Sequence, residues 1–177
     1  NQDNVTVLNG IFNMNLDNAG SMTFNGLTSL NNDLMIQPNS TFIISSHYAA
    51  GAVLRVVDGL TNNGMIEFVS SYPNSYGTLE LTSGTLVNEP GGTIQSSSGF
   101  SRIFAPLDNR GSMILKSNME IKKESAAHSN SGSITVSNGN LKLTQTGTDP
   151  SFTSTGTITV ESARILTVDG GIFNFNS

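Results

Sequence analysis

Short segments in which apolar and polar residues alternate recur along this chain, and each follows the same kind of turn. The recurring phrase is Asn-x-Gly-(Ser/Thr)-(Ile/Met)-x-apolar, as in the segment from Asn130 to Val136. Its copies begin at Asn18, Asn62, Asn88, Asn109, Asn130 and Ser154, and the copy from Asn88 is two residues longer than the others. A turn followed by a two-residue alternation, repeated many times, predicts a solenoid of short strands.

The spacing of the copies sets the size of the repeat. The glycines of the phrase lie at positions 20, 64, 92, 111, 132 and 156, with gaps of 44, 28, 19, 21 and 24 residues. The first gap is roughly twice the others, which indicates that one copy between Gly20 and Gly64 has lost its signature. Counted in this way, the repeat is about 23 residues long, in the range of repeat architectures.

Each repeat also holds a second alternation, such as Leu141-Lys-Leu143, so it contains two or three short strands. This pattern predicts an all-β protein with one domain over residues 1–177, a right-handed parallel β-helix of about eight irregular coils. An antiparallel sandwich is the structural alternative, because it also has short strands and regular turns. A sandwich, however, gives no reason for Asn and Gly to recur in register.

Stacking of the coils assigns a role to each position of the phrase, because equivalent residues lie about 4.8 Å apart in neighbouring coils. The asparagines before the glycine are expected to form a ladder of side-chain amides. The expected inward apolar stack contains Ile66, Ile94, Met113, Ile134 and Ile158. The expected outward hydroxyl row contains Ser21, Thr93, Ser112, Ser133 and Thr157. These roles are structural.

Composition narrows the possible functions. Charged residues make up only 12% of the chain, which is typical of extended secreted β-structures. The net charge of −5 argues against general nucleic-acid binding, and the absence of cysteine excludes disulfides and thiolate metal sites. No apolar run is long enough to span a membrane. The start at Asn1 and the apolar ends lead us to expect a fragment of a larger exported protein.

Basic residues gather in one part of the chain. Five of the eight, namely Arg102, Arg110, Lys116, Lys122 and Lys123, fall within one to two coils, and Asp108 lies among them. β-Helices that cleave polysaccharides use clustered carboxylates along one face. No second carboxylate recurs at the coil spacing beside Asp108, so no catalytic residue is assigned. A solvated, mutually neutralising face is the competing interpretation of this stretch.

Tyrosines suggest a platform for sugar rings. Tyr72 and Tyr76 lie in a turn-rich insertion, and Tyr48 lies roughly one coil earlier, although packing onto the coil would explain them equally well. The complete candidate ligand-binding set is Tyr48, Tyr72, Tyr76, Arg102, Asp108, Arg110 and Lys116.

Metal and ice binding receive little support from the sequence. His47 and His128 have no metal-type spacing and are expected at surface or turn positions. No cofactor is expected, beyond an adventitious Ca²⁺ held by turn carbonyls and an Asp. The outward Thr-x-Thr array that ice binding needs is present only in the last one or two copies of the phrase.

The phrase, together with Gly139-Asn-Leu141-Lys-Leu143, resembles the coils of large bacterial surface β-helices. Filamentous haemagglutinin-like proteins and autotransporter passenger adhesins are the families concerned. The resemblance implies secretion, surface display and adhesion, with no catalytic residues to carry over. Uneven coil lengths distinguish this chain from those families.

The sequence therefore predicts a non-catalytic structural or adhesive segment of an extracellular or cell-surface bacterial protein. Its solenoid face would bind glycans or protein partners, with no nucleic acid and no membrane insertion, and the oligomeric state is left open. The alternative is a carbohydrate-active enzyme or carbohydrate-binding module, of the polysaccharide lyase or hydrolase type.

Overall fold

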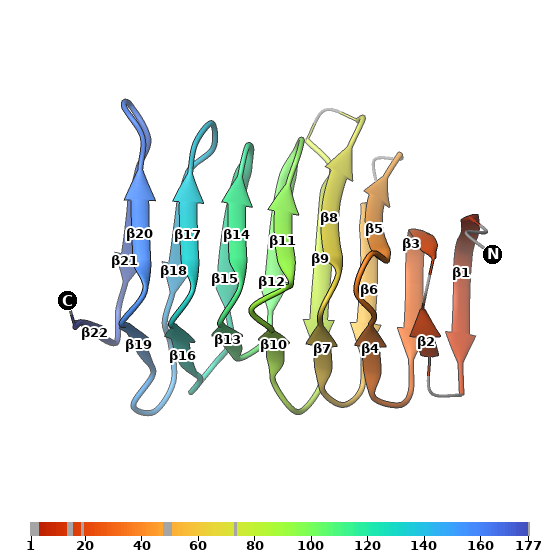
Figure 1. The fold of residues 1–177 in the computed structure, drawn as a ribbon, viewed down its shortest axis with the longest axis horizontal. Helices are drawn as coiled ribbons and strands as arrows, with labels where there is room; N and C mark the ends of the chain where they lie inside the picture. The colour runs from red at the N-terminus through yellow and green to blue at the C-terminus, as the bar shows by residue number, and fades with distance from the viewer. Residues whose placement is uncertain (1–3, 14–15, 19, 48–50, 73, 177) are drawn as a thin grey trace.

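In the computed structural model, the chain winds into a parallel β-solenoid whose coils lie side by side along its long axis (Figure 1). The structure describes residues 4–13, 16–18, 20–47, 51–72 and 74–176. The strand pairs of this part of the chain are all parallel, which confirms the β-helix and excludes the antiparallel sandwich. The described residues include no helix, and hence none long and apolar enough to cross a membrane.

Six successive coils each contribute three separate strands, which lie on three faces of the solenoid. The first face contains β4 (Leu34–Ile36), β7 (Leu60–Asn62), β10 (Leu86–Asn88), β13 (Leu107–Asn109), β16 (Ala127–Asn130) and β19 (Ser151–Ser154). The second face contains β5 (Thr41–Ser46), β8 (Met65–Ser70), β11 (Thr93–Ser96), β14 (Ser112–Leu115), β17 (Ser133–Val136) and β20 (Thr157–Val160). The third face contains β6 (Ala52–Val56), β9 (Tyr76–Leu81), β12 (Phe100–Phe104), β15 (Asn118–Lys122), β18 (Leu141–Thr144) and β21 (Leu166–Asp169).

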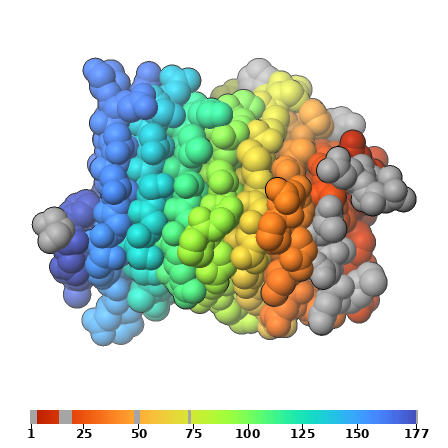
Figure 2. Space-filling view, viewed as in Figure 1, coloured from red at the N-terminus to blue at the C-terminus, as the bar shows by residue number. Residues whose placement is uncertain are grey.

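Incomplete coils flank these six. They comprise β1 (Asn4–Phe12), β2 (Leu16–Asn18) and β3 (Ser21–Leu30) at one end and β22 (Ile172–Phe175) at the other. The long strand β3 pairs with both β5 and β6, so it joins the second and third faces into one 14-stranded sheet. Figure 2 shows the coils as successive colour bands, so each coil contacts mainly its sequence neighbours. The count is close to the expected eight coils once the incomplete ones are included.

The register of the second face confirms the expected apolar stack. Ile66, Ile94, Met113, Ile134 and Ile158 are consecutive partners in the sheet. The copy of the phrase that the sequence lacks is also found, because Phe42 pairs with Met22 on one side and Ile66 on the other. In that copy Ser40 takes the glycine position, and its carbonyl accepts from the Met65 N–H at 2.9 Å.

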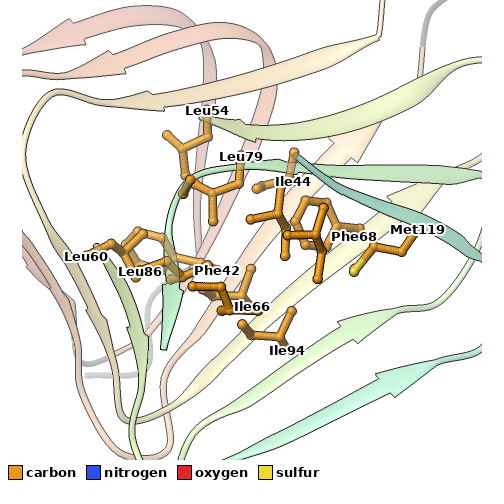
Figure 3. Packing of buried hydrophobic residues seen from close by; sticks show 14 of the residues in the cluster. Phe42, Ile44, Leu54, Leu60, Ile66, Phe68, Leu79, Leu86, Ile94 and Met119 are labelled. Atoms are coloured by element: carbon orange, nitrogen blue, oxygen red, sulfur yellow. The ribbon is translucent and has the colours of Figure 1, made fainter. Parts of the chain in front are cut away.

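Buried apolar residues from all three faces meet in the interior (Figure 3). Phe42, Ile66 and Ile94 come from the second face, and Leu60 and Leu86 from the first. These residues are at most 1% exposed. Each of them packs against the equivalent residue of the next coil, so the core is continuous along the axis and burial of apolar area stabilises every coil through its neighbours.

His128 interrupts this apolar interior. It lies on β16, pairs in register with Phe152, and is only 2% exposed. The expectation of a surface or turn position was therefore wrong for this residue. Its Nδ1 accepts a hydrogen bond from the Leu107 backbone N–H at 3.2 Å. Burial lowers the pKa of His128 to about 4, so the imidazole is neutral at pH 7.

The expected asparagine ladder is present at the end of the first face. Nδ2 of one residue donates to Oδ1 of the next, from Asn62 to Asn88 (2.7 Å), to Asn109 (2.7 Å) and to Asn130 (2.6 Å). Asn130 then donates to the Ser154 hydroxyl at 2.9 Å. The first three amides also donate to a backbone carbonyl of the next coil, at 3.1–3.2 Å. All four asparagines are at most 2% exposed, so the ladder satisfies a column of buried polar groups.

The glycine that follows the ladder allows the coils to approach closely at this corner. A Cβ atom on Gly111 would lie 2.3 Å from the carbonyl oxygens of Glu89 and Gly92. On Gly132 it would lie 2.1 Å from the Gly111 oxygen. Because these contacts are with backbone atoms, any side chain would push neighbouring coils apart.

Candidate functional site

The structure distributes the sequence-predicted ligand-binding residues over different parts of the surface. Tyr76 and Arg102 lie on β9 and β12 of the third face. Asp108 lies on β13 of the first face, and Arg110 follows that strand directly. A corner of only two residues, Ala105 and Pro106, turns the chain from β12 to β13 and separates the two pairs.

The other members of the predicted set lie in connections. Tyr72 belongs to the connection between β8 and β9 and is 49% exposed. Lys116 is exposed in the two-residue connection between β14 and β15. Tyr48 lies outside the described residues.

The pair on the first face is neutralised by its own neighbours. Arg110 Nη2 lies 2.6 Å from Asp108 Oδ2, and Arg110 Nη1 lies 3.3 Å from Glu89 Oε1. The Ser129 hydroxyl donates to the second Asp108 oxygen at 2.7 Å. The hydrogen bond and charge of Asp108, with a smaller contribution from Glu89, raise the pKa of Arg110 above its ordinary value. Asp108 is thus held by an arginine and a serine rather than by a second carboxylate.

Arg102 is surrounded in a different way. Along β12 the outward side chains are Phe100, Arg102 and Phe104, and Tyr76 of β9 pairs in register with Phe100. We call these four residues the aromatic–arginine cluster. The Arg102 Cζ atom lies 4.0 Å from the centre of the Tyr76 ring and 5.2 Å from that of Phe100. Stacking of a guanidinium on aromatic faces holds the cation in a defined position.

The positive charge of Arg102 has no ionic partner among the described residues. Its register neighbour on β15 is Glu120, which accepts a hydrogen bond from the Thr144 hydroxyl at 2.8 Å. Glu80 on β9 pairs instead with Arg55, at 3.0 Å. The Arg102 Nε atom is buried and has no hydrogen-bond partner. A buried donor normally finds an acceptor, and Arg164 Nε also lacks one. Arg102 is distinguished by its stacking on Tyr76 and Phe100.

A hollow of about 220 Å³ adjoins the cluster at Phe104, and Lys122, Lys123 and Glu124 line the rest of it. Lys123 extends past the preceding coil to the coil before it, where its Nζ donates to the Leu81 carbonyl at 2.8 Å. Its ammonium is therefore partly satisfied by backbone, whereas Lys122 is exposed. The hollow extends the cluster towards the corner between the third and first faces.

A second polar group surrounds His47, near the ends of β5 and β8. His47 Nε2 lies 2.8 Å from the Ser45 hydroxyl, and Nδ1 lies 2.7 Å from the Ser71 hydroxyl. Both ring nitrogens are therefore occupied by serines, and no carboxylate orients the ring in the way a nucleophile–base–acid arrangement requires. Within the described ranges, no group of three or more His, Cys, Asp and Glu could hold a metal ion.

Sequence reasoning missed the two phenylalanines of the cluster. The signal was available, because Phe100, Arg102 and Phe104 alternate within five residues and so share one side of a strand. Only the outward direction of that side was unknown.

In comparisons with known proteins, no family model, no curated protein and no solved structure matches this chain. Its function is therefore argued from the geometry of its faces.

Proposed function

We propose that this chain is a non-catalytic segment of a bacterial protein that is secreted or displayed on the cell surface. It acts as a stiff scaffold that carries an adhesive face for glycans or protein partners. The observation that carries the proposal is a difference between the inward and the outward side chains of the coils. Equivalent inward positions repeat the same residue types from coil to coil, whereas the outward third-face position of Arg102 is occupied by Thr78, Glu120 and Lys142 in neighbouring coils.

The interior residues stabilise the coils independently of the outward side chains of any one face. The second-face stack and the asparagine ladder both run through consecutive coils, and their members are almost completely buried except Ile158, which is half-buried at the C-terminal end. In a solenoid each coil is stabilised mainly by its two neighbours, so outward side chains can vary at little cost to stability. Such a scaffold suits a segment whose surface evolves for recognition.

The outside offers one position suited to recognition, the aromatic–arginine cluster. Half-buried aromatic rings and an arginine without an ionic partner are the residue types that dominate binding surfaces. The low content of charged residues, 12%, is consistent with an extracellular β-structure.

The alternative of a carbohydrate-active enzyme would rely on Asp108. This carboxylate is bound by Arg110 and Ser129 and lies on a different face from Arg102 and Tyr76. A general acid must donate a proton to the substrate and a general base must accept one, so either group has to be free and within reach of the substrate. The geometry therefore favours the adhesive function over the enzymatic one.

A glycan array probed with the purified chain, combined with an assay for new reducing ends and unsaturated products on acidic polysaccharides, tests the proposal. We expect retention on a subset of glycans without turnover. Turnover that disappears in Asp108→Ala but persists in Asp58→Ala, a carboxylate in the connection between β6 and β7, would establish the enzyme instead. An array without any retention would remove the glycan-adhesive part of the proposal.

A further inference from the structure

We propose that the aromatic–arginine cluster of the third face binds an extended saccharide that carries carboxylate groups. This inference rests on the adhesive function proposed above and names the chemistry of its ligand. Its starting point is Arg102, whose guanidinium is stacked on Tyr76 and Phe100 but meets no carboxylate within ion-pair distance among the described residues.

Because the Arg102 guanidinium has no ion-pair partner among the described residues, we expect its ligand to be an anion. The Arg102 Nε–H is buried and lacks an acceptor. The register neighbour of Arg102, Glu120, accepts from Thr144. Glu80, the register neighbour of Phe104, is paired with Arg55. A guanidinium presents parallel N–H groups that match the two oxygens of a carboxylate. A ligand carboxylate placed over β12 would therefore pair with the terminal N–H groups of the guanidinium and neutralise its charge.

The rings of Phe100 and Phe104, which flank Arg102, favour a ligand with flat, partly apolar units. Phe100 and Phe104 lie two residues to either side of Arg102 on the same strand. At about 3.3 Å per residue they are about 13 Å apart, with Arg102 midway between them. Aromatic side chains offer apolar faces against which sugar rings pack. An extended oligosaccharide lying along β12 would thus contact both rings and present an acidic group to the arginine.

Basic residues near Phe104 add further positive charge to this part of the third face. The hollow of about 220 Å³ beside Phe104 is lined by Lys122, Lys123 and Glu124, so two cations face it against one carboxylate. Lys122 is exposed, so its ammonium can meet a second acidic group of the polymer. The chain as a whole carries a net charge of −5 and would repel a polyanion elsewhere. This part of the third face is therefore the favoured place for an anionic polymer.

Three probes separate ring stacking from charge. Binding of the full chain is measured by titration calorimetry with hexagalacturonate, with its methyl-ester form, and with hexaglutamate. The ester keeps the sugar rings without the charge, and the peptide keeps the charge without the rings. We expect hexagalacturonate to bind at least about tenfold more tightly than either of the others, because only it combines sugar rings for stacking with carboxylates for Arg102. Equal binding of the ester or of the peptide would overturn the inference.

Matched variants locate the binding. Arg102→Gln should weaken hexagalacturonate binding by at least about tenfold, since it removes the charged donors. Arg102→Lys should also weaken it, because lysine keeps the charge and loses the paired donors. Arg55→Gln is the matched control, an arginine of the same face that already has Glu80 as its partner. It should change the affinity by less than about twofold, since exposed pairs contribute little.

The outcomes are distinct from those of the glycan array. If a sulfated or neutral glycan is retained and hexagalacturonate is not, the adhesive function stands and the carboxylate inference fails. If Arg55→Gln weakens binding as much as Arg102→Gln, the site is a diffuse charge effect and the inference also fails. Equal thermal midpoints of all variants show that the affinities compare folded proteins.

Discussion

The asparagine ladder of the first face and the aromatic–arginine cluster of the third face place polar groups in opposite situations. Each buried amide of the ladder donates to the next coil and accepts from the previous one or from its own turn. Arg102, by contrast, has a buried N–H without an acceptor, and its charge has no ionic partner within the described part of the chain. The same solenoid therefore holds a satisfied polar column on one face and an arginine with an unsatisfied N–H on another.

The difference shows which residues carry the fold and which are available for recognition. Groups that recur in register and hydrogen-bond to one another stabilise the stack, so removing one is expected to lower the free energy of unfolding. A group that occurs once, faces outward and lacks a partner contributes little to stability. Substitutions in the two regions should separate these roles.

The largest effect is expected for Asn109→Ala. The change leaves the amide of Asn88 without one acceptor and the carbonyl oxygen of Asn130 without its donor, both in buried positions. We expect a loss of about 2–5 kcal/mol in the free energy of unfolding, measured by urea denaturation. Asn138→Ala, an exposed asparagine, is the control and should change it by less than about 0.5 kcal/mol. Similar values for the two variants would show that the ladder adds no stability.

The buried His128 should make the first face sensitive to acid. Its pKa of about 4 lies below the ordinary value of 6.5 for an unfolded chain, so between these values the unfolded state binds more protons. The contribution is therefore complete above pH 6.5 and declines as the pH falls towards 4, by about 3 kcal/mol in total. Urea unfolding of the wild type and His128→Leu at pH 7 and pH 4 measures it. Equal losses in both proteins would assign the acid sensitivity to other groups.

Close approach of the coils beside the ladder should make Gly111→Ala costly. The new methyl group would meet two backbone oxygens at 2.3 Å, which displaces one coil from the next. We expect a loss of about 1–3 kcal/mol in the free energy of unfolding. In Gly91→Ala the new Cβ lies 3.7 Å from the Asn63 carbonyl oxygen, the nearest atom beyond its chain neighbours, so this variant is the control. A thermal midpoint for Gly111→Ala equal to that of Gly91→Ala would show that the corner can relax.

The smallest effect on stability is expected for the outward arginines. Arg110→Gln removes exposed ion pairs, and we expect a thermal midpoint that cannot be distinguished from the wild type. The same variant should leave saccharide binding unchanged, because it lies on the first face. If Arg110→Gln and Arg102→Gln reduced binding equally, the distinction between the neutralised and the unpartnered arginine would be wrong.

Much of the fold could be predicted from the sequence because stacking makes chemically equivalent positions repeat. The inward stack and the amide ladder were found from one phrase, and the register confirms both. The copy between Gly20 and Gly64 was hidden because Ser40 replaces the glycine and Phe42 replaces the isoleucine. His128 was misplaced because it occupies an apolar position without an apolar side chain. A polar residue in such a position breaks the pattern from which burial is inferred.

The candidate site was harder to predict because corner lengths decide which residues share a face. Arg102 and Arg110 are eight positions apart in the sequence, yet the corner at Ala105 and Pro106 directs them to different faces. Tyr76 and Arg102, far apart in sequence, become neighbours because β9 and β12 are adjacent strands. The ligand-binding role of these residues stays a prediction.

The asparagine ladder also gives the solenoid a net dipole of aligned side-chain amides. Every amide in the described ladder donates toward the C-terminal coil, so the side-chain dipoles of Asn62, Asn88, Asn109 and Asn130 align along the long axis. Aligned hydrogen bonds polarise one another, which strengthens each of them. Inverting a single amide would place two donors or two acceptors face to face on either side of it. The column is therefore expected to switch only as a whole, and its interior should be among the last parts of the molecule to exchange amide protons with solvent.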